Sequence, residues 1–325
     1  MPVTDRAVSA AAVAPRTQFA PEVDAVTTRL MANLWGTTEP EVLALVHLRI
    51  AQLLRNDAEF ERVPKGAPQI SSEKMAALSQ WPTSPLFSDL ERACLGFTEQ
   101  FVMDVAGVSE ELRDSVGEYL DPAELGGFVT ALYLLDYGQR TEMAVGRLFP
   151  DAGVALFADA EVVRVAGSPP RGVSLQSDLD ELLKATARLD SLDMVTTEVV
   201  RLRGARRHNC RICQSTRSVK ALDAGADEAM FDKIDRYEGS DLIESHKVAL
   251  RLTDAIITQP SEIDPSLVAQ VHEHFTPPQI VEIISDVMRN SCQKVAVALA
   301  VDDPHVTSGV ELYAIADDGD VEFLG

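Results

Sequence analysis

The stretch that decides the fold reads EVVRLRGARRHNCRIC and covers residues 198–213. It opens with helical periodicity and ends with two thiols, Cys210 and Cys213, that lie one helical turn apart. Arginines surround the thiols, although the chain has 51 acidic against 29 basic side chains and a formal net charge of -22. Thiols in a cationic setting indicate redox chemistry, because positive charge favours the reactive thiolate.

Size and charge limit what the protein can be. A chain of 325 residues, 46% of them hydrophobic, has the length of two domains that each bury a core. The acidic balance argues against nucleic acid and anionic membranes as partners, since both bind basic surfaces. No apolar run has the length of a secretory signal or a membrane span, so we expect a cytoplasmic protein. Four cysteines are too few for a disulfide framework, and a CxxC pair in a reducing compartment indicates catalysis, redox sensing or metal binding.

Helical periodicity, interrupted by turn residues, organises the chain into two series of helices. The series divide the chain into a flexible N-terminal segment (1–21), a first helical domain (22–150), a linker (151–174), a second helical domain (175–301) and a C-terminal tail (302–325). The linker contains Gly167-Ser-Pro-Pro-Arg-Gly172, and residues 311–323 of the tail are suited to a small hairpin. The predicted fold class is all-α.

The second half repeats the first at a nearly constant offset. His47-Leu48-Arg49 recurs 154 residues later as Arg201-Leu202-Arg203. The helix start Asp121-Pro122 recurs 155 residues later as Thr276-Pro277, each with an N-cap residue followed by proline. Amphipathic helices also resemble one another by chance, but an offset that survives several turns favours a duplication.

The helices are repeated in the two halves, but the two thiols are not. Asn56 and Glu59 stand 154 residues before Cys210 and Cys213, and neither carries a thiol. Only the second copy is expected to be active.

The local geometry of the second copy follows from helix rules. Asn209 is a suitable N-cap, which predicts a helix over 210–224 that starts at Cys210. Glu198 lies twelve residues earlier, about 18 Å away in an unbroken helix. It reaches the thiols only if the chain turns near residues 206–209, and otherwise it pairs with Arg201 or Arg203.

The stretch 198–213 resembles the carboxymuconolactone decarboxylase and alkyl hydroperoxidase D superfamily in residue type and spacing. The hydroperoxidase branch carries Glu-x11-Cys-x2-Cys-x3-His, and the resemblance extends over about 190–300 and, without the thiols, over about 40–148. It implies two tandem AhpD-like helical bundles, the first of them degenerate. It also implies thiol-dependent peroxide reduction without a metal or another cofactor, in a homo-oligomer.

The resemblance implies roles for individual residues. Cys213 would attack the peroxide, Cys210 would resolve the product as a disulfide, and Glu198 would relay protons. The relay histidine is replaced by Arg217, which can stabilise anions but cannot exchange a proton near neutral pH. His208 or His246 takes over the relay only if the fold brings it close.

Other functions remain open at this point. One is a lyase or isomerase of the decarboxylase branch that acts on an acidic metabolite. Another is a noncatalytic redox sensor. A peroxidase would take a small hydroperoxide as substrate and a dithiol protein or small thiol as reductant. Zinc would need two further ligands that no second CxxC supplies. Cys94 and Cys292 lie in apolar helical patterns and are expected to be buried.

Overall fold

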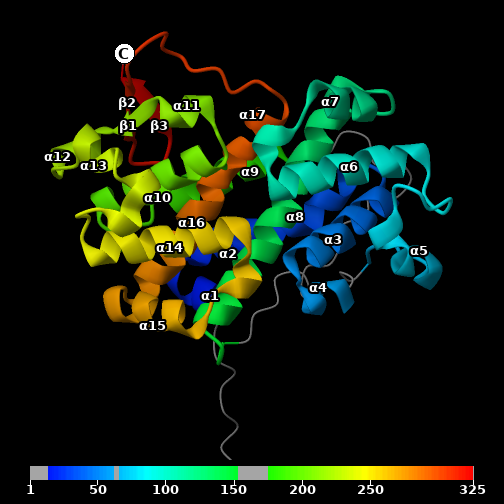
Figure 1. Cartoon of the computed structure of the whole chain (residues 1–325), viewed down its shortest axis with the longest axis horizontal. Coiled ribbons are helices and arrows are strands. Elements are labelled where there is room, and N and C mark those ends of the chain that lie inside the picture. The colour runs from blue at the N-terminus through cyan, green and yellow to red at the C-terminus, as the bar shows by residue number, and fades with distance from the viewer. Residues whose placement is uncertain (1–13, 62–65, 153–174, 325) are drawn as a thin grey trace, which may run out of the picture.

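The structure is a computed structural model that describes residues 14–61, 66–152 and 175–324. These residues are mostly helical, with one small sheet near the C-terminal end (Figure 1). The all-α prediction is confirmed at this level. No helix within these ranges is both long enough and apolar enough to cross a membrane. The predicted linker stretch 167–172 lies outside the described residues.

The helices of the first half begin at signals in the sequence. Ser88 and Asp121 form capping boxes with the glutamates three residues later, Glu91 and Glu124. The helices are α1 (Pro15–Phe19), α2 (Pro21–Asn33), α3 (Pro40–Leu54), α4 (Asp57–Glu61), α5 (Ser72–Ala76), α6 (Asp89–Met103), α7 (Glu110–Gly117) and α8 (Pro122–Leu148). Short 3₁₀ turns occur at η1 (Leu34–Gly36), η2 (Leu78–Gln80) and η3 (Val105–Gly107). Within the N-terminal segment predicted over 1–21, residues 15–19 form α1.

The second half follows a similar order. The helices are α9 (Gln176–Ala187), α10 (Met194–Arg207), α11 (Arg211–Gln214), α12 (Val219–Asp223), α13 (Glu228–Phe231), α14 (Glu244–Thr258), α15 (Pro265–His274), α16 (Pro277–Asn290) and α17 (Lys294–Ala298). The 3₁₀ turns are η4 (Ile234–Gly239), η5 (Pro260–Glu262) and η6 (Ser291–Gln293). Thr276 caps α16 in a capping box with Gln279, and Pro277 is the first helical residue, as expected from the sequence.

The two halves share one hydrophobic core. Helix α3 packs against α6 and α8, α10 packs against α14 and α16, and the halves meet where α2 contacts α9 and α8 contacts α16. Figure 1 shows α8 and α16 between the other helices of the two halves. One continuous cluster of buried side chains includes Leu48 and Phe128 from the first half and Ile256 and Ile284 from the second. The second half also has a smaller cluster of its own around Phe231, while the apolar faces of α8 and α16 are buried against each other within the larger cluster.

A buried ion cluster also joins the halves. Asp136 of α8 pairs with Arg140 at 2.6 Å and with Lys294 of α17 at 2.8 Å. Arg140 also donates to the carbonyls of Ile256 and Ile257. Buried charges are tolerated when they are paired and hydrogen-bonded in this way. The cluster therefore fixes how the second half sits on α8.

The sheet has the order β1-β2-β3 and contains β1 (Thr216–Ser218), β2 (Glu311–Ile315) and β3 (Val321–Leu324). Strands β2 and β3 form an antiparallel hairpin where the sequence predicted one. Strand β1 pairs with β2 in parallel, with Ser218 opposite Tyr313. The predicted helix over 210–224 is therefore wrong: it is divided into α11, β1 and α12, because the tail pairs with its middle.

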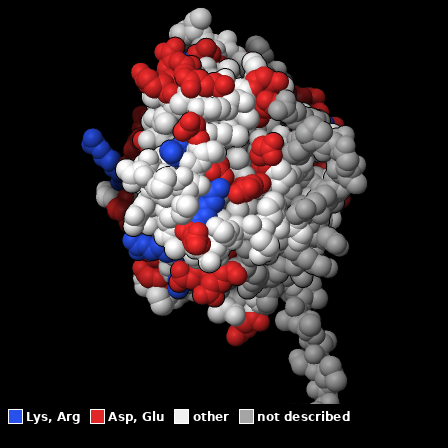
Figure 2. All heavy atoms as spheres, turned by 90° about the vertical axis from the view of Figure 1, so that its right-hand side faces the viewer, with Lys and Arg blue, Asp and Glu red and all other residues white. Residues whose placement is uncertain are grey.

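The acidic composition is visible on the surface. Figure 2 shows the face on the right-hand side of Figure 1, where Asp and Glu predominate and Lys and Arg are few. Several basic side chains elsewhere are held in ion pairs, among them Arg29 with Asp178 and Arg251 with Glu238. The face in Figure 2 therefore offers little positive charge.

Candidate redox site

A reversal of the chain after α10 positions the two cysteines. Asn209 adopts the left-handed conformation at φ 50, which asparagine tolerates better than most residues. The Cys210 amide then donates to the Ala205 carbonyl at 2.9 Å, so the chain folds back on the last turn of α10. Cys210, and not Asn209, is the N-cap of α11, and its Sγ accepts from the Cys213 amide at 3.2 Å. The predicted N-cap was wrong because Asn209 is needed to make the turn.

The two cysteines are joined in a disulfide, and their Cα atoms lie 5.3 Å apart. They differ in exposure: Cys210 is 1% exposed, whereas Cys213 is half-buried and lines a cavity. Cys94 and Cys292 are free thiols. Cys94 is fully buried, and Cys292 is half-buried in the wall of the same cavity as Cys213. Burial raises the pKa of both free thiols to about 12, which keeps them protonated near neutral pH.

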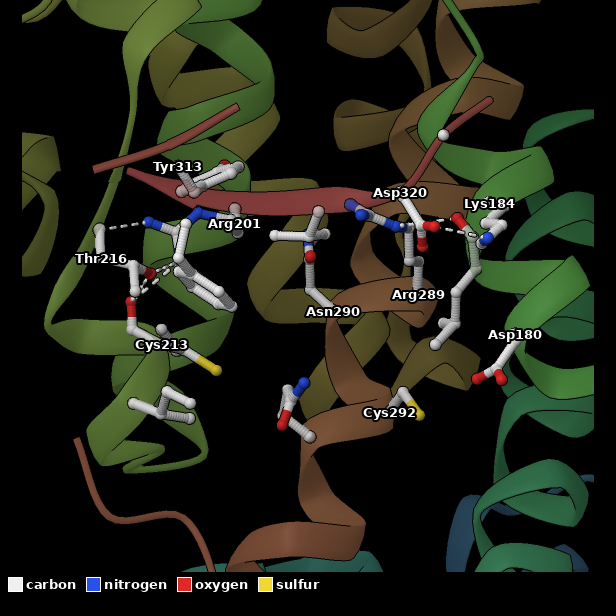
Figure 3. A pocket seen from close by; sticks show the side chains of 17 residues that line it. Asp180, Lys184, Arg201, Cys213, Thr216, Arg289, Asn290, Cys292, Tyr313 and Asp320 are labelled. Atoms are coloured by element: carbon white, nitrogen blue, oxygen red, sulfur yellow. Dashed lines mark hydrogen bonds and ion pairs between the residues drawn. The ribbon is translucent and has the colours of Figure 1, made fainter. Parts of the chain in front are cut away.

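The cavity has a volume of about 530 Å³ and lies between the CxxC turn, α9, α16 and the C-terminal hairpin. This volume falls in the range of small-molecule sites. Figure 3 shows Arg289 and Asn290 of α16 between Arg201 and Tyr313 on one side and Lys184 and Asp320 on the other. The wall thus combines polar groups from four separate segments of the chain.

Glu198 lies at the centre of a fully bonded network. It is 1% exposed, and its carboxylate accepts from Arg201 Nε and Nη2, both at 2.7 Å. It also accepts from the Ser218 amide at 3.1 Å and from the Tyr313 hydroxyl at 2.9 Å. Of the two partners that the sequence left open, Glu198 therefore pairs with Arg201.

Arg201 connects this carboxylate to the redox turn. Its Nη1 donates to the Cys213 carbonyl at 2.9 Å, and its Nη2 donates to the Thr216 carbonyl at 2.8 Å. Its guanidinium also lies over the Tyr313 ring, 5.2 Å from the centroid. Burial disfavours the Arg201 charge, but Glu198 outweighs it and holds the pKa of Arg201 above its usual value. Arg201 therefore stays charged and fixes the backbone of Cys213.

Arg217 is engaged outside the cavity. It forms a two-point ion pair with Glu228 of α13, at 2.7 and 2.9 Å. It also donates to the Gln214 carbonyl and lies over the Phe231 ring. Arg217 is not among the residues that line the cavity. The structure thus places this predicted site residue where it secures α13 against β1.

The two candidate relay histidines also lie outside the cavity lining. His208 is buried and its Nε2 lies 3.1 Å from the Ser291 hydroxyl. Burial, and then the charges of Lys294 and Arg140, hold the pKa of His208 well below its usual value. Burial lowers the pKa of His246, against the opposing charge of Asp193. Asp193 is the N-cap of α10, so His246 lies near the opposite end of this 14-residue helix from the cysteines. A helix of that length spans about 21 Å.

Among the cavity residues that sequence reasoning missed are Tyr313 and Arg289. Tyr313 arrives on β2, which was expected only as part of a terminal hairpin. Arg289 lies in the last turn of α16, where a basic residue is ordinary. The parallel pairing of β1 with β2 could have revealed Tyr313, but three-residue strands have no periodicity that a sequence pattern can detect.

Comparison with known proteins finds relatives, but their names do not state an activity. No model of a protein family matches the chain, and no solved structure does. The chain is 36% identical over 242 residues to "Uncharacterized protein Rv2313c" of Mycobacterium tuberculosis strain H37Rv, across 73% of this chain and 82% of that protein. A part of 109 residues is 28% identical to "Uncharacterized protein YnjA" of Escherichia coli K12, across 33% of this chain and 60% of that protein. With the identity and coverage of the mycobacterial match, the chain belongs to the same protein family as Rv2313c.

Proposed function

We propose that this protein is a thiol-dependent peroxidase in which Cys213 reacts with the peroxide and Cys210 resolves the product. The observation that carries the proposal is the unequal placement of the two bonded cysteines. Cys213 lines a cavity of about 530 Å³, whereas Cys210 is 1% exposed behind it. A peroxide that enters the cavity meets Cys213 first.

The proposed cycle balances without a metal or another cofactor. The Cys213 thiolate attacks the distal peroxide oxygen, the O–O bond breaks, and the alkoxide leaves and takes up a proton as an alcohol. Cys213 is then a sulfenic acid. The Cys210 thiolate attacks its sulfur, hydroxide leaves as water after protonation, and the disulfide of this structure forms. An external dithiol reduces the disulfide and is itself oxidised, which resets both cysteines.

The surroundings of the thiols support this assignment. The Cys213 amide donates to Cys210 Sγ, and an amide donor of this kind favours the thiolate that resolution requires. Arg201 holds the Cys213 carbonyl, and Glu198 holds Arg201. In this arrangement Glu198 acts on Cys213 through Arg201. Glu198 is therefore a positioning residue in the disulfide state.

We also infer that the chain consists of two tandem AhpD-like bundles that share one core. Helices α6 (Asp89–Met103) and α14 (Glu244–Thr258) begin and end 155 residues apart, and so do η3 and η5. The left-handed residues that end α3 and α10, Arg55 and Asn209, lie 154 residues apart.

An equivalent ion pair occurs in each half. Arg49 pairs with Glu99 at 2.7 Å, and Arg203 pairs with Asp254 at 2.8 Å. Both carboxylates also accept from an aromatic side chain, Trp81 in the first half and Tyr237 in the second. Chance resemblance between helices does not account for repeated side-chain bonds, so these pairs support a duplication.

The proposal is tested by following hydroperoxide consumption with dithiothreitol as reductant. Wild type is expected to turn over, and Cys213→Ser is expected to lose turnover completely. Cys210→Ser, treated with hydroperoxide in the absence of dithiothreitol, is expected to form one sulfenic acid per chain, detected by dimedone labelling, because the resolving thiol is gone. Cys94→Ala removes a thiol remote from the cavity and is expected to retain turnover.

Two outcomes would overturn the proposal. One is a wild type that consumes no hydroperoxide with any dithiol donor. The other is a Cys210/Cys213 double variant that retains the wild-type rate. Conversion of an acidic metabolite by that double variant would instead indicate the lyase or isomerase chemistry of the decarboxylase branch.

A further inference from the structure

Arg289 is a cavity residue whose charge has no ion-pair partner among the described residues. It lies near the end of α16, and its Nε donates to the Leu183 carbonyl at 3.1 Å. Its terminal nitrogens have no hydrogen bond and no carboxylate within ion-pair distance in the described parts of the chain. A guanidinium that faces a cavity in this state can bind an anion at two points.

The other cations around the site are already neutralised. Lys184, on the opposite wall, pairs with Asp320 at 2.7 Å. The neighbouring arginines all have carboxylate partners: Arg201 with Glu198, Arg203 and Arg207 with Asp254, Arg206 with Asp235, Arg211 with Asp302, and Arg217 with Glu228. Among the described residues that line the cavity, Arg289 is thus the cation without a carboxylate partner.

The carboxylates near Arg289 do not cancel its charge fully. Asp286 lies one turn earlier on α16, is 3% exposed, and has one oxygen without a hydrogen-bond partner. Burial raises the pKa of Asp286 to about 7, so it is partly protonated at neutral pH. Asp180 also lines the cavity, but among the described residues it makes no ion pair with Arg289 and accepts instead from Gln176, on its own helix. Positive charge therefore remains available at Arg289.

The rest of the wall suits a ligand with a polar head and an apolar body. Asn290 adjoins Arg289 and offers amide donors to the cavity. Apolar side chains complete the wall of the cavity: Leu183, Ala205, Ile212, Val321 and Phe323. Their burial against an alkyl chain would contribute about 25 cal/mol for each Å² removed from water.

We propose that the cavity binds an organic carboxylate, with its carboxylate on Arg289 and its apolar chain along the hairpin and α11 toward Cys213. The next step rests on the proposed peroxidase function: the substrate is then an organic hydroperoxide that also carries a carboxylate group. Hydrogen peroxide and neutral alkyl hydroperoxides lack the group that Arg289 recognises.

The test measures binding without turnover, so it can fail independently of the peroxidase proposal. Titration calorimetry of the oxidised full-length protein with octanoate is expected to show binding at least tenfold tighter than with octan-1-ol. Arg289→Gln is expected to lose at least tenfold in octanoate affinity, and Arg289→Lys is expected to recover part of it. Arg236→Gln removes an exposed arginine elsewhere and is expected to bind as the wild type does.

A second measurement places the ligand. In the reduced protein, octanoate is expected to slow the alkylation of Cys213 by iodoacetamide at least fivefold, and octan-1-ol is expected to have little effect. Equal affinity for the acid and the alcohol, an unchanged affinity in Arg289→Gln, or no protection of Cys213 would each overturn the inference. Turnover of tert-butyl hydroperoxide with no octanoate binding would refute this inference while leaving the peroxidase proposal intact. Octanoate binding without any hydroperoxide turnover would refute the peroxidase proposal while leaving the carboxylate-binding inference intact.

Discussion

The Tyr313 hydroxyl donates to Glu198 Oε2 at 2.9 Å, although 115 residues separate the two in the chain. The contact is buried, and the same tyrosine ring lies under the guanidinium of Arg201. The last hairpin of the protein therefore completes the polar network that holds the redox turn.

Replacing the tyrosine tests this contact. Tyr313→Phe keeps the ring on Arg201 and removes only the hydroxyl donor to a buried carboxylate. Since a hydrogen bond to a charged group contributes about 1.5–3 kcal/mol, the free energy of unfolding is expected to fall by that amount. The measurement is urea denaturation of the oxidised protein. Tyr119→Phe changes a tyrosine that is 44% exposed and is expected to leave stability unchanged. Equal stability of both variants would argue that the contact contributes nothing.

Two glutamates that pair with arginines are expected to differ sharply. Glu198→Gln leaves the Arg201 charge buried without its partner, so the loss in unfolding free energy is expected to be about 3–5 kcal/mol. Glu228→Gln breaks the pair with Arg217, whose side chain is only 8% exposed, but the Glu228 side chain is 55% exposed and its place is open to water, so the loss is expected to be smaller, about 1–2 kcal/mol. Chemical denaturation of both variants provides the comparison. A loss for Glu228→Gln as large as that for Glu198→Gln would contradict the burial argument.

The turn of the hairpin depends on a glycine. Gly319 has φ 90, and a Cβ there would lie 2.4 Å from the Lys184 carbonyl oxygen, a backbone atom of α9. Gly319→Ala is therefore expected to lift the turn from α9 and to increase amide hydrogen exchange in residues 311–324 by at least tenfold. Gly309→Ala has a similar φ of 76 with open space around the new Cβ, so it carries the backbone strain without the clash. A similar exchange increase in both variants would show that strain alone matters.

Asp286 predicts a pH-dependent difference in stability. Burial first, with help from Glu282 and against the charge of Arg289, raises the pKa of Asp286 in the folded state to about 7 from its usual 3.8. The folded state therefore retains a proton that the unfolded state releases, and this stabilisation is lost as pH rises from about 4 to about 7. Asp286→Asn removes this titration. Its stability relative to wild type is expected to increase by a few kcal/mol over that interval and to be constant above it.

Thermal unfolding at a series of pH values measures this profile. Asp317→Asn changes a carboxylate on the exposed hairpin turn and is expected to follow the wild-type profile. A stability difference between Asp286→Asn and wild type that does not change between pH 4 and pH 8 would show that the carboxyl is not protonated in the fold.

Features that depend on neighbouring residues could be predicted from the sequence. Helix starts at Asp121 and Thr276 follow from capping chemistry, and the hairpin follows from the polar turn around Gly319. The CxxC pair was recognised by its spacing, and the structure joins those two cysteines.

Features set by distant contacts could not be predicted. Strand β1 exists because β2 pairs with it, and that pairing divides the helix that local periodicity indicated. Arg217 was assigned to the thiols because the family resemblance places a relay histidine at that position, but Glu228 supplies a carboxylate that no spacing rule identifies. His208 follows directly on α10 and yet contacts Ser291, 83 residues later. Side-chain direction depends on how the halves pack, which the sequence pattern does not specify.

The parallel pairing of β1 with β2 also sets an order of events during synthesis. Glu198 emerges from the ribosome 115 residues before Tyr313, a delay on the order of ten seconds at ordinary rates of translation. During this interval the helices of both halves can pack, while the segment after Cys213 still lacks the strand that pairs with it. Until the tail arrives, the cavity beside Cys213 lacks the wall that the hairpin supplies.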